Sequence, residues 1–481
     1  MILWTDRVAG SLLGLAAGDA LGAGYEFATP PTGEVAMVGG GLGGWQPGEW
    51  TDDTQMAICI AEVTAAGVVD VDAIANRFME WYDSRPADVG IATSAVLRAA
   101  SGSEETSAET LHEAAESFLQ DHPKGGAGNG ALMRTAPVAL AHLGDDAAIA
   151  ASARAVAELT HADPLAGDSC VLWSIAIDRA VRDGRLDGAH EGIALLPPER
   201  QERWRGWLRD AETETPKAFR PNGFTVAALQ AAHAAVHQTP VPDDGPPARH
   251  LQDALHEAVR IGHDTDTVAA IAGSLLGARW GATAVPFAWR RLLQGWPGRR
   301  AADLVRLAVL TARKGEPDEV GWPVAERIVG DPPPFVVAVP GDDDLLLGNL
   351  AALDEVVAEV DVVVSLCRVG TRQVPPSVEH YEVILSDGDQ DGDNPNLAMV
   401  LADTAAALLT LRAEGKRVFV HCVHGRSRTP TVAAVMLAQR EGISGVEAWD
   451  RIAEVLPASE HNEAFQAILA ALPASVSAPQ G

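Results

Sequence analysis

Two kinds of hydrophobic pattern divide the chain into two parts. In the first part, alanine and other apolar residues recur at the three- and four-residue spacing of amphipathic helices, as in residues 53–66, 149–159 and 251–260. In the second part, short unbroken runs of Val, Ile and Leu, such as Val362–Cys367, alternate with helical patterns. Such runs are typical of buried parallel strands. The pattern therefore predicts a multidomain protein, with an all-α N-terminal domain and an α/β C-terminal domain that has a central, mostly parallel sheet.

A polar, proline-rich stretch separates the two patterns. Lys314–Asp318 begins it and Asp331–Pro334 ends it, and this composition is typical of linkers. We therefore expect one domain at residues 1–313, a linker at 314–334 and a second domain at 335–475. Residues 237–250 contain four prolines and are expected to form a surface loop within the helical part.

Composition restricts the class of protein. With 481 residues, of which 47% are hydrophobic, the chain can bury large cores. Its formal net charge of −30 predicts that it repels nucleic acid and anionic membranes, so neither is an expected partner. No apolar run has the length needed to span a membrane. The four cysteines are widely separated and form no paired framework, which fits a reducing cytoplasm.

One motif in the second part combines a cysteine with an arginine. His421–Thr429 follows the apolar run 417–420 and precedes an Ala/Val-rich helical pattern, so we expect a loop between a strand and a helix. The backbone N–H groups of such a loop and the positive end of the helix dipole suit a phosphate dianion. Arg428 would close this cradle with a bidentate fork, and Cys422 would act as a nucleophilic thiolate. A buried cysteine beside surface arginines is the alternative, which Gly425 in mid-loop disfavours.

This motif resembles that of the cysteine-dependent protein tyrosine phosphatases, in particular the small dual-specificity branch. Leu345–Ala351 is similar to the opening strand and turn of that branch. The resemblance implies hydrolysis of phosphomonoesters through a cysteinyl-phosphate intermediate, with Gly425 and Thr429 at the bound phosphate. It also implies a general acid in the acidic loop before the cysteine. Asp387 directly follows a predicted strand and is slightly favoured, whereas Asp391 has the more usual spacing. The phosphatase substrate stays open.

The helical part contains two similar acidic clusters. Trp50–Gln55 and Gly262–Thr267 each precede a predicted helix and place carboxylates and threonine hydroxyls at its N-terminus. Capping explains one such cluster well, but four carboxylates in two clusters are better explained by bound cations. Oxygen donors without imidazole or thiolate in the acidic core favour Mg²⁺ or Mn²⁺ over zinc. If the clusters meet, two ions about 3.5–4 Å apart can activate a water.

Residues 1 to about 312 resemble an ADP-ribosylglycohydrolase of the dinitrogenase-reductase-activating type. Gly10–Gly22 matches the opening helix and turn of that family, and Glu26 follows in a Tyr-Glu-Phe context. The resemblance implies two magnesium ions, with Mn²⁺ as an alternative. The metal ligands that it implies are Thr51, Asp52, Asp53, Asp264, Asp266 and Thr267. It places Glu26 at the metal-site water or the substrate, with a carboxylate such as Asp53 or Glu26 handling protons. His263 stands where the family often has glycine.

Further matches to this family concern the substrate. Gly125–Arg134 resembles its substrate loop, and His161 matches a position near the ligand. Asp88 matches the aspartate that members acting on ADP-ribosylarginine use against the guanidinium, although a surface-loop acid explains it almost as well. The residues implied in substrate binding are Asp88, Gly128, Asn129, Gly130 and His161. The implied chemistry is cleavage of the N-glycosidic bond at the distal ribose.

Together the two resemblances predict a bifunctional hydrolase. Its expected substrates are ADP-ribosylated proteins, with the arginine linkage favoured, and phosphorylated proteins, or small-molecule analogues of either. One alternative is a glycohydrolase whose C-terminal domain only binds phosphate. The other is a non-enzymatic structural protein on the glycohydrolase fold. The oligomeric state stays open, as does whether the two sites share a target.

Overall fold

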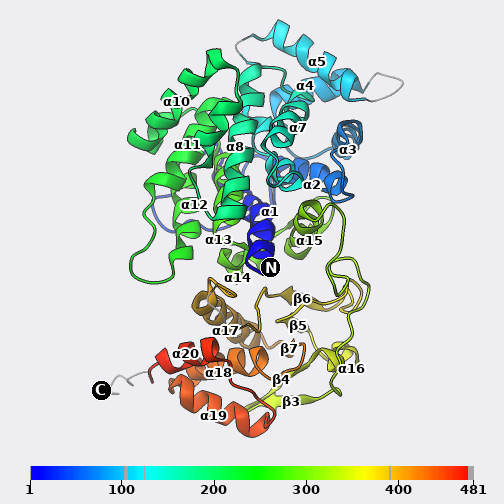
Figure 1. The fold of residues 1–481 in the computed structure, drawn as a ribbon, viewed down its shortest axis with the longest axis vertical. Helices are drawn as coiled ribbons and strands as arrows, with labels where there is room; N and C mark the ends of the chain where they lie inside the picture. Colours follow the sequence, from blue (N-terminus) through cyan, green and yellow to red (C-terminus); the bar gives the residue numbers. More distant parts are fainter. Residues whose placement is uncertain (1, 102–106, 124, 389–391, 475–481) are drawn as a thin grey trace. The chain divides into compact units, whose positions relative to one another are not determined.

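The structure is a computed structural model that describes residues 2–101, 107–123, 125–388 and 392–474. The chain forms two compact units (Figure 1). The helical unit consists of Trp4–Val285 and Trp289–Glu316. The sheet unit consists of the described residues from Pro317 onward, together with Pro286–Ala288 and the start of the chain. The predicted division into a helical part and an α/β part is confirmed at this level.

The helical unit is built from long helices around a buried centre. Helix α13 (Thr265–Trp280) is buried from Thr265 to Ala278, because its small and apolar residues face neighbours on every side. One short antiparallel ladder, β1 (Gln294–Gly295) with β2 (Arg299–Arg300), departs from the all-α prediction. The helices are α1 (Ile2–Gly22), α2 (Asp52–Thr64), α3 (Val71–Asp83), α4 (Ile91–Ala100), α5 (Ala108–Asp121), α6 (Ala136–Ala141), α7 (Asp146–Glu158), α8 (Pro164–Asp183), α9 (Gly188–Gly192), α10 (Pro198–Thr213), α11 (Thr225–Gln238), α12 (His250–Ile261), α13 (Thr265–Trp280), α14 (Phe287–Leu292) and α15 (Ala301–Ala312).

Glycines spaced four apart bring α1 against α13. A Cβ atom on Gly14 or Gly18 would collide with the α13 backbone at Gly273 or Ala269, so no larger residue fits there. A Cβ on Gly22 would lie 2.5 Å from the Cα of Asp266. This close crossing places the C-terminal end of α1 beside the N-terminal end of α13.

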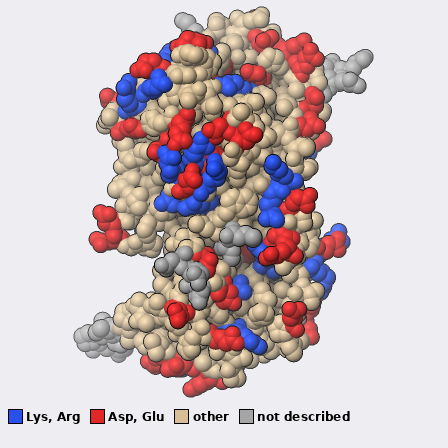
Figure 2. Space-filling view, viewed as in Figure 1, with Lys and Arg blue, Asp and Glu red and all other residues tan. Residues whose placement is uncertain are grey.

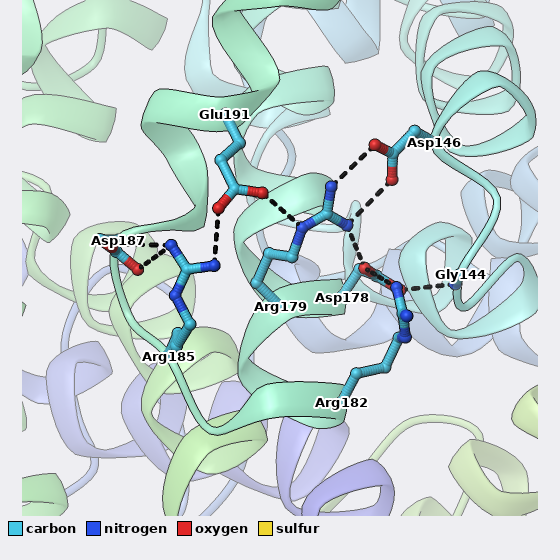
Figure 3. Close-up of polar contacts among 8 residues, drawn as sticks. All are labelled: Gly144, Asp146, Asp178, Arg179, Arg182, Arg185, Asp187 and Glu191. Atoms are coloured by element: carbon cyan, nitrogen blue, oxygen red, sulfur yellow. Dashed lines mark hydrogen bonds and ion pairs between the residues drawn. The ribbon is translucent and has the colours of Figure 1, made fainter.

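An ion-pair network joins α7, α8 and α9 (Figure 3). The guanidinium of Arg179 on α8 donates to Asp146 of α7, to Glu191 of α9 and to the buried Asp178. Asp178 also accepts the backbone N–H of Gly144, at 2.7 Å. Charges of both signs are interspersed on the face seen in Figure 2. The network therefore binds three helices together through one largely buried arginine.

The sheet unit contains a five-stranded sheet of order β3-β4-β7-β5-β6. The β3–β4 pair is antiparallel and the other pairs are parallel, with Leu347 opposite Val420 and Val364 opposite Val420. The strands are β3 (Val336–Val339), β4 (Asp342–Asn349), β5 (Val362–Ser365), β6 (Glu379–Glu382) and β7 (Val418–Cys422). The helices are α16 (Leu353–Val356), α17 (Leu397–Ala413), α18 (Arg428–Glu441), α19 (Gly445–Val455) and α20 (Glu463–Ala471).

Side chains of the central strands alternate between two cores. Val418 and Val420 of β7 belong to the larger core, which includes residues of α17–α20, whereas Phe419 belongs to the smaller core beside α16. Burial on both faces explains why the strands appear in the sequence as unbroken apolar runs. Part of the stretch predicted as a linker packs on this unit, because Ala325 accepts the N–H of Thr371 at 2.9 Å. In the described ranges, no helix is long and apolar enough to cross a membrane.

Candidate functional site

The N-terminus of α2 carries the first acidic cluster. Thr51 is the N-cap, and its hydroxyl donates to Asp53 Oδ2 at 3.0 Å. The carboxylate of Asp19, from α1, accepts the N–H groups of Thr51 and Thr54 at 3.0 Å each and the Thr54 hydroxyl at 2.5 Å. Asp19 therefore accepts the free backbone N–H groups at the start of α2. The carboxylates of Asp52 and Asp53 are not needed as caps of this helix.

The N-terminus of α13 carries the second cluster, and two asparagines hold it. Asp264 is the N-cap; its backbone N–H donates to Asn222 Oδ1 at 3.0 Å, and its Oδ2 accepts from Asn129 Nδ2 at 2.8 Å. Thr265 donates to the carbonyl of Gly22 at 2.8 Å, which fixes the helix start against α1. These contacts bury Asp264 and Asp266, as the small residues of α13 had predicted.

The two clusters meet, and Asp266 belongs to both of the groups that they form. Carboxylate oxygens of Asp19, Asp53 and Asp266 lie within 4.8 Å of one another, and so do those of Glu26, Asp264 and Asp266. In the described part of the chain, buried oxygens of Asp53, Asp266 and Glu26 have no hydrogen-bond partner. Unpaired buried carboxylate oxygens require a cation or a proton, so this donor set fits divalent metal ions.

Electrostatics at the clusters agree with that requirement. Burial, followed by the charges of Asp19, Asp52 and Asp264, raises the pKa of Asp53 well above its usual value. Burial and the charge of Asp53 do the same to the pKa of Asp266. The hydroxyl of Thr267 lies 3.5 Å from Asp53 Oδ2, so it also faces the combined cluster.

Glu26 and Asp88 lie at the edge of the combined cluster. Burial, and then the charges of Asp264 and Asp88, raise the pKa of Glu26 to about 8. Burial, and then the charge of Asp88, raise the pKa of Asp52 to about 8. Asp88 is half-buried and its Oδ1 accepts the N–H of Val89 at 2.9 Å. The charge of Asp88 thus acts on both Glu26 and Asp52.

The glycine loop predicted to hold the substrate lies against His161. A Cβ on Gly128 would be 3.1 Å from His161 Nε2, and a Cβ on Gly130 would be 3.1 Å from its Cε1. Asn129 connects this loop to the combined carboxylate cluster, because its side chain donates to Asp264. Burial, followed by the charge of Arg134, lowers the pKa of His161 to about 3, so the imidazole is neutral at physiological pH.

Hydrogen bonds from Arg134 and Thr160 favour one tautomer of that imidazole. Arg134 is fully buried, and its Nη2 donates to the hydroxyl oxygen of Thr160 at 2.7 Å. Because a guanidinium can only donate, the Thr160 hydroxyl is free to give its own hydrogen to His161 Nδ1, at 2.8 Å. The Nε2 of His161 then carries the ring hydrogen and presents a donor toward the glycine loop.

His263, which stands where glycine was expected, adopts a positive φ as glycine would. His263 has φ +74°, which glycine adopts freely, so the turn before Asp264 keeps a glycine-like shape. Phe27 also has positive φ, at +49°, and its N–H donates to the His263 carbonyl at 2.7 Å. Their rings meet edge-on with centroids 4.8 Å apart. This pair links the turns that carry Glu26 and Asp264.

In the sheet unit, the Cys422 loop joins β7 to α18 as expected. The Gly425 N–H donates to Cys422 Sγ at 3.2 Å, and Gly425 has φ +70°. Arg428, at the first position of α18, donates through Nη1 to the carbonyls of Leu366 and Leu385 at 2.8 and 3.2 Å. In the described residues, the buried hydroxyl of Thr429 has no partner. The Arg428 guanidinium is thus bound to backbone carbonyls of two neighbouring segments, and Cys422 Sγ accepts from its own loop.

Of the two general-acid candidates, the structure places one. Asp387 Oδ2 lies 3.8 Å from Arg428 Nη2, and its backbone carbonyl accepts from Asn462 Nδ2 at 3.0 Å. Asp391 lies outside the described residues. Asp387 is therefore held at the Arg428 end of the loop.

The sequence analysis missed two residues, Asp19 and Asn222, whose hydrogen bonds hold the combined carboxylate cluster in place. Asp19 stands inside the matched Gly10–Gly22 motif, where its capping of α2 was not foreseen. Asn222, whose Nδ2 also donates to the Gly262 carbonyl at 3.1 Å, follows a cis Arg220-Pro221 peptide bond in a loop. Its position in the sequence gives no signal of this role.

The fold and the cluster define a class of helical protein with a carboxylate site for divalent cations. The profile of the ADP-ribosylglycohydrolase family matches residues 2–318, and the chain belongs to this family. Members of the family use divalent metal ions, and membership supports an enzyme with ADP-ribosylglycohydrolase activity. The profile leaves most of the sheet unit unassigned.

Individual relatives agree with the family. The chain is 32% identical over 293 residues to the ADP-ribosyl-[dinitrogen reductase] glycohydrolase of Rhodospirillum rubrum, covering 59% of this chain and 89% of that protein. It is 32% identical over 296 residues to the ADP-ribosylarginine hydrolase Tri1 of Pseudomonas putida, covering 59% and 73%.

Solved structures differ between the two units. One similar solved structure is an ADP-ribosylglycohydrolase-related protein complex, with 29% identity and a TM-score of 0.51. The alignment covers 66% of this chain and the whole of that chain. For the sheet unit, human DUSP28 matches 29% of this chain and 93% of that chain, with 27% identity and a TM-score of 0.26. The second score is too low to assign a fold, so the phosphatase resemblance of this unit stays a prediction.

Proposed function

We propose that the helical unit hydrolyses the N-glycosidic bond between ADP-ribose and an arginine side chain of a modified protein, with two Mg²⁺ ions bound. The observation that carries this proposal is the position of Asp266 in both carboxylate groups, each with unpaired oxygens. Two adjacent cation positions that share one carboxylate follow from that arrangement. The name of the Pseudomonas relative supports the arginine linkage.

The carboxylates and threonines of the two helix N-termini would hold the ions. Bound Mg²⁺ supplies orientation of the ribose hydroxyls and activation of a water. The expected ligands are Thr51, Asp52, Asp53, Asp264, Asp266 and Thr267. Asp19 also belongs to the first carboxylate group, and its hydrogen bonds from α2 hold that group in place.

The remaining residues orient the substrate and transfer protons. His161 donates from Nε2 to an oxygen of the ribose or pyrophosphate that lies along the glycine loop. Asp88 accepts from the guanidinium of the modified arginine. As the bond from the ribose carbon to the guanidinium nitrogen breaks, water adds to that carbon and the departing nitrogen takes up a proton. Glu26, whose pKa is raised to about 8 without ions, accepts the proton that the water loses.

The experiment measures free ADP-ribose released from a protein carrying ADP-ribosylarginine, with magnesium and with chelator. Wild type should release it only with magnesium, and Asp53→Asn should not. Asp88→Asn should lose activity on the arginine linkage while magnesium still stabilises the protein. Magnesium-dependent release that Asp88→Asn leaves intact contradicts the role of Asp88. The absence of release from wild type contradicts the arginine linkage, and release in chelator contradicts the role of the metal.

A phosphomonoesterase activity of the sheet unit is the second candidate. The contact from the Gly425 N–H to Cys422 Sγ favours it, because this donor fixes the sulfur in the loop that leads to Arg428 and Thr429. The sulfur attacks phosphorus, the ester oxygen leaves with a proton from Asp387, and water then hydrolyses the cysteinyl-phosphate. Asp391 stays an untested alternative for the acid.

An aryl phosphate distinguishes this enzyme from a phosphate-binding module. Wild type should hydrolyse it, whereas Cys422→Ser should bind phosphate without turnover, because the serine hydroxyl is a weaker nucleophile. Binding without hydrolysis in both proteins would support the non-catalytic alternative for this unit. If neither unit shows turnover, the alternative of a structural protein on the glycohydrolase fold gains support. The domain bounds 1–313 and 335–475 and the cytoplasmic location stay predictions.

A further inference from the structure

A second group of metal-ligating side chains lies on α9, α10 and α11, on elements that do not supply the carboxylate cluster. The Nε2 atoms of His190 and His233 lie 2.7 and 3.2 Å from one oxygen, Oε1 of Glu212. All three ligand atoms lie within 4.8 Å of one another. Two imidazole nitrogens and a carboxylate oxygen thus converge from three separate elements.

The backbones that carry this group are held in place by other contacts. On α11, Gln238 Nε2 donates to the carbonyls of Ala211 and Glu214 at 2.8 Å each, on either side of Glu212. Gln230 Nε2 donates to the Trp207 carbonyl at 2.9 Å, so α10 is bound to α11 at two levels. Figure 1 shows these two helices side by side. The separation of His233 and Glu212 is therefore fixed before any ligand binds.

The third ligand is held from the opposite side. His190 precedes Glu191, whose carboxylate accepts from Arg179 Nε at 2.7 Å in the network of Figure 3. Arg185 adds a second ion pair to Glu191, also at 2.7 Å. Buried residues of α9 also pack on α8, so packing and these ion pairs together hold His190 in place.

Burial gives the group one closed side and one open side. The side chain of His233 is 0% exposed, whereas those of His190 and Glu212 are 38% and 36% exposed. The His237 ring stacks on His233 with centroids 3.8 Å apart and closes the inner side.

We propose that His190, Glu212 and His233 bind a transition-metal ion of the Zn²⁺ class, with water in the open fourth position, and thereby join α9, α10 and α11. Two imidazoles and a carboxylate are ligands for zinc rather than for magnesium. Zinc–ligand bonds of about 2.1 Å at tetrahedral angles require ligand atoms about 3.4 Å apart. The observed 2.7 and 3.2 Å therefore need to open only slightly.

Zinc alone, titrated into the full-length chain, tests the proposal. The background is Cys422→Ser, which removes a competing thiolate, and excess Mg²⁺ occupies the carboxylate cluster. Three variants are compared on this background. His190→Ala and Glu212→Gln each remove one partly exposed ligand. His112→Ala is the matched control, because His112 pairs with Glu116 at 3.5 Å on α5, far from the group in sequence.

The background and the control should each bind zinc at this site, while His190→Ala and Glu212→Gln should each weaken binding at least tenfold. Zinc should also raise the melting temperature of the background but not that of His190→Ala. Equal zinc affinity in all four proteins, or none in any, would mean that the three side chains form only a hydrogen-bonded triad. A loss in only one of the two ligand variants would equally contradict a three-ligand site.

Discussion

Replacing Asp266 with asparagine should stabilise the ion-free protein and weaken its response to magnesium. Without ions, Asp266 is buried beside Asp53, Glu26 and Asp264, and one of its oxygens has no partner among the described residues. Asparagine keeps the size of the side chain and removes a repelled charge. We therefore expect Asp266→Asn to raise the free energy of unfolding in chelator by about 1–3 kcal/mol at neutral pH.

With magnesium, wild type should regain most or all of this difference in stability. A ligand that binds only the folded state stabilises it by about 2.7 kcal/mol at a concentration of 100 times Kd. Wild type should gain this amount, which corresponds to a rise in melting temperature of roughly 5 °C. Because Asp266 belongs to both carboxylate groups, the variant loses a ligand of both positions and should gain less than about 1 kcal/mol.

Thermal unfolding followed by circular dichroism, in chelator and over a magnesium titration, measures both effects. Asp70→Asn is a matched control, because Asp70 caps α3 through the Ala73 N–H at 3.0 Å and asparagine can replace it as a cap. The control should respond to magnesium as wild type does. If Asp266→Asn is less stable than wild type in chelator and responds equally to magnesium, Asp266 is a structural cap and the cation argument is wrong.

The pH dependence of the ion-free protein gives a second measurement of the same electrostatics. The pKa values of Glu26 and Asp52 are raised to about 8 in the folded state. Unfolded carboxyls titrate near pH 4, so the folded state binds more protons between these values. Stability in chelator should therefore fall as pH rises from about 4 to about 8 and then level off. Saturating magnesium should flatten this fall, and an equal fall with magnesium would contradict cation binding at these carboxyls.

Three further predictions concern single side chains. Thr160→Val breaks the relay to His161 and should lower kcat/KM for ADP-ribose release about tenfold, whereas Thr160→Ser should retain it; equal activity of both variants contradicts the relay. Arg179→Met should destabilise the protein by about 2 kcal/mol in denaturant unfolding, and Arg185→Met, on the exposed side of the network, should destabilise it less. His263→Gly relieves positive φ while losing the Phe27 contact, so the free energy of unfolding should change by less than about 1 kcal/mol with activity kept.

Features determined by local sequence could be predicted. The starts of α2 and α13 follow Thr51 and Asp264, because a side-chain oxygen before an apolar helix is a local signal. The β7 strand and the turn at Gly425 were likewise recognisable from an apolar run and a glycine at fixed spacing. Burial of Asp266 followed from the small residues of α13, since close helix packing leaves no path for water.

Features determined by distant residues could not be predicted in this way. Asn222 reaches Asp264 across 42 positions, and nothing around Asn222 distinguishes it from any loop asparagine. Arg134 looks like the end of a loop motif, yet it is fully buried and contacts His161 through the Thr160 hydroxyl. Such roles depend on which loops the fold brings together, and that information is spread over the whole helical unit.

Charge neutrality gives an independent reason for two divalent ions. Six buried carboxyls gather at the cluster: Asp19, Glu26, Asp52, Asp53, Asp264 and Asp266. The buried guanidinium of Arg134 interacts with Asp52 and offsets one of these charges. The N-termini of α2 and α13 each contribute about half a positive charge, and together they offset about one more. The roughly four negative charges that remain equal the charge of two divalent cations, whereas a single ion would leave about two carboxyls protonated or unpaired. Measuring the magnesium stoichiometry of the wild-type chain by equilibrium dialysis checks this argument directly, and saturation at one ion with no further proton release would contradict it.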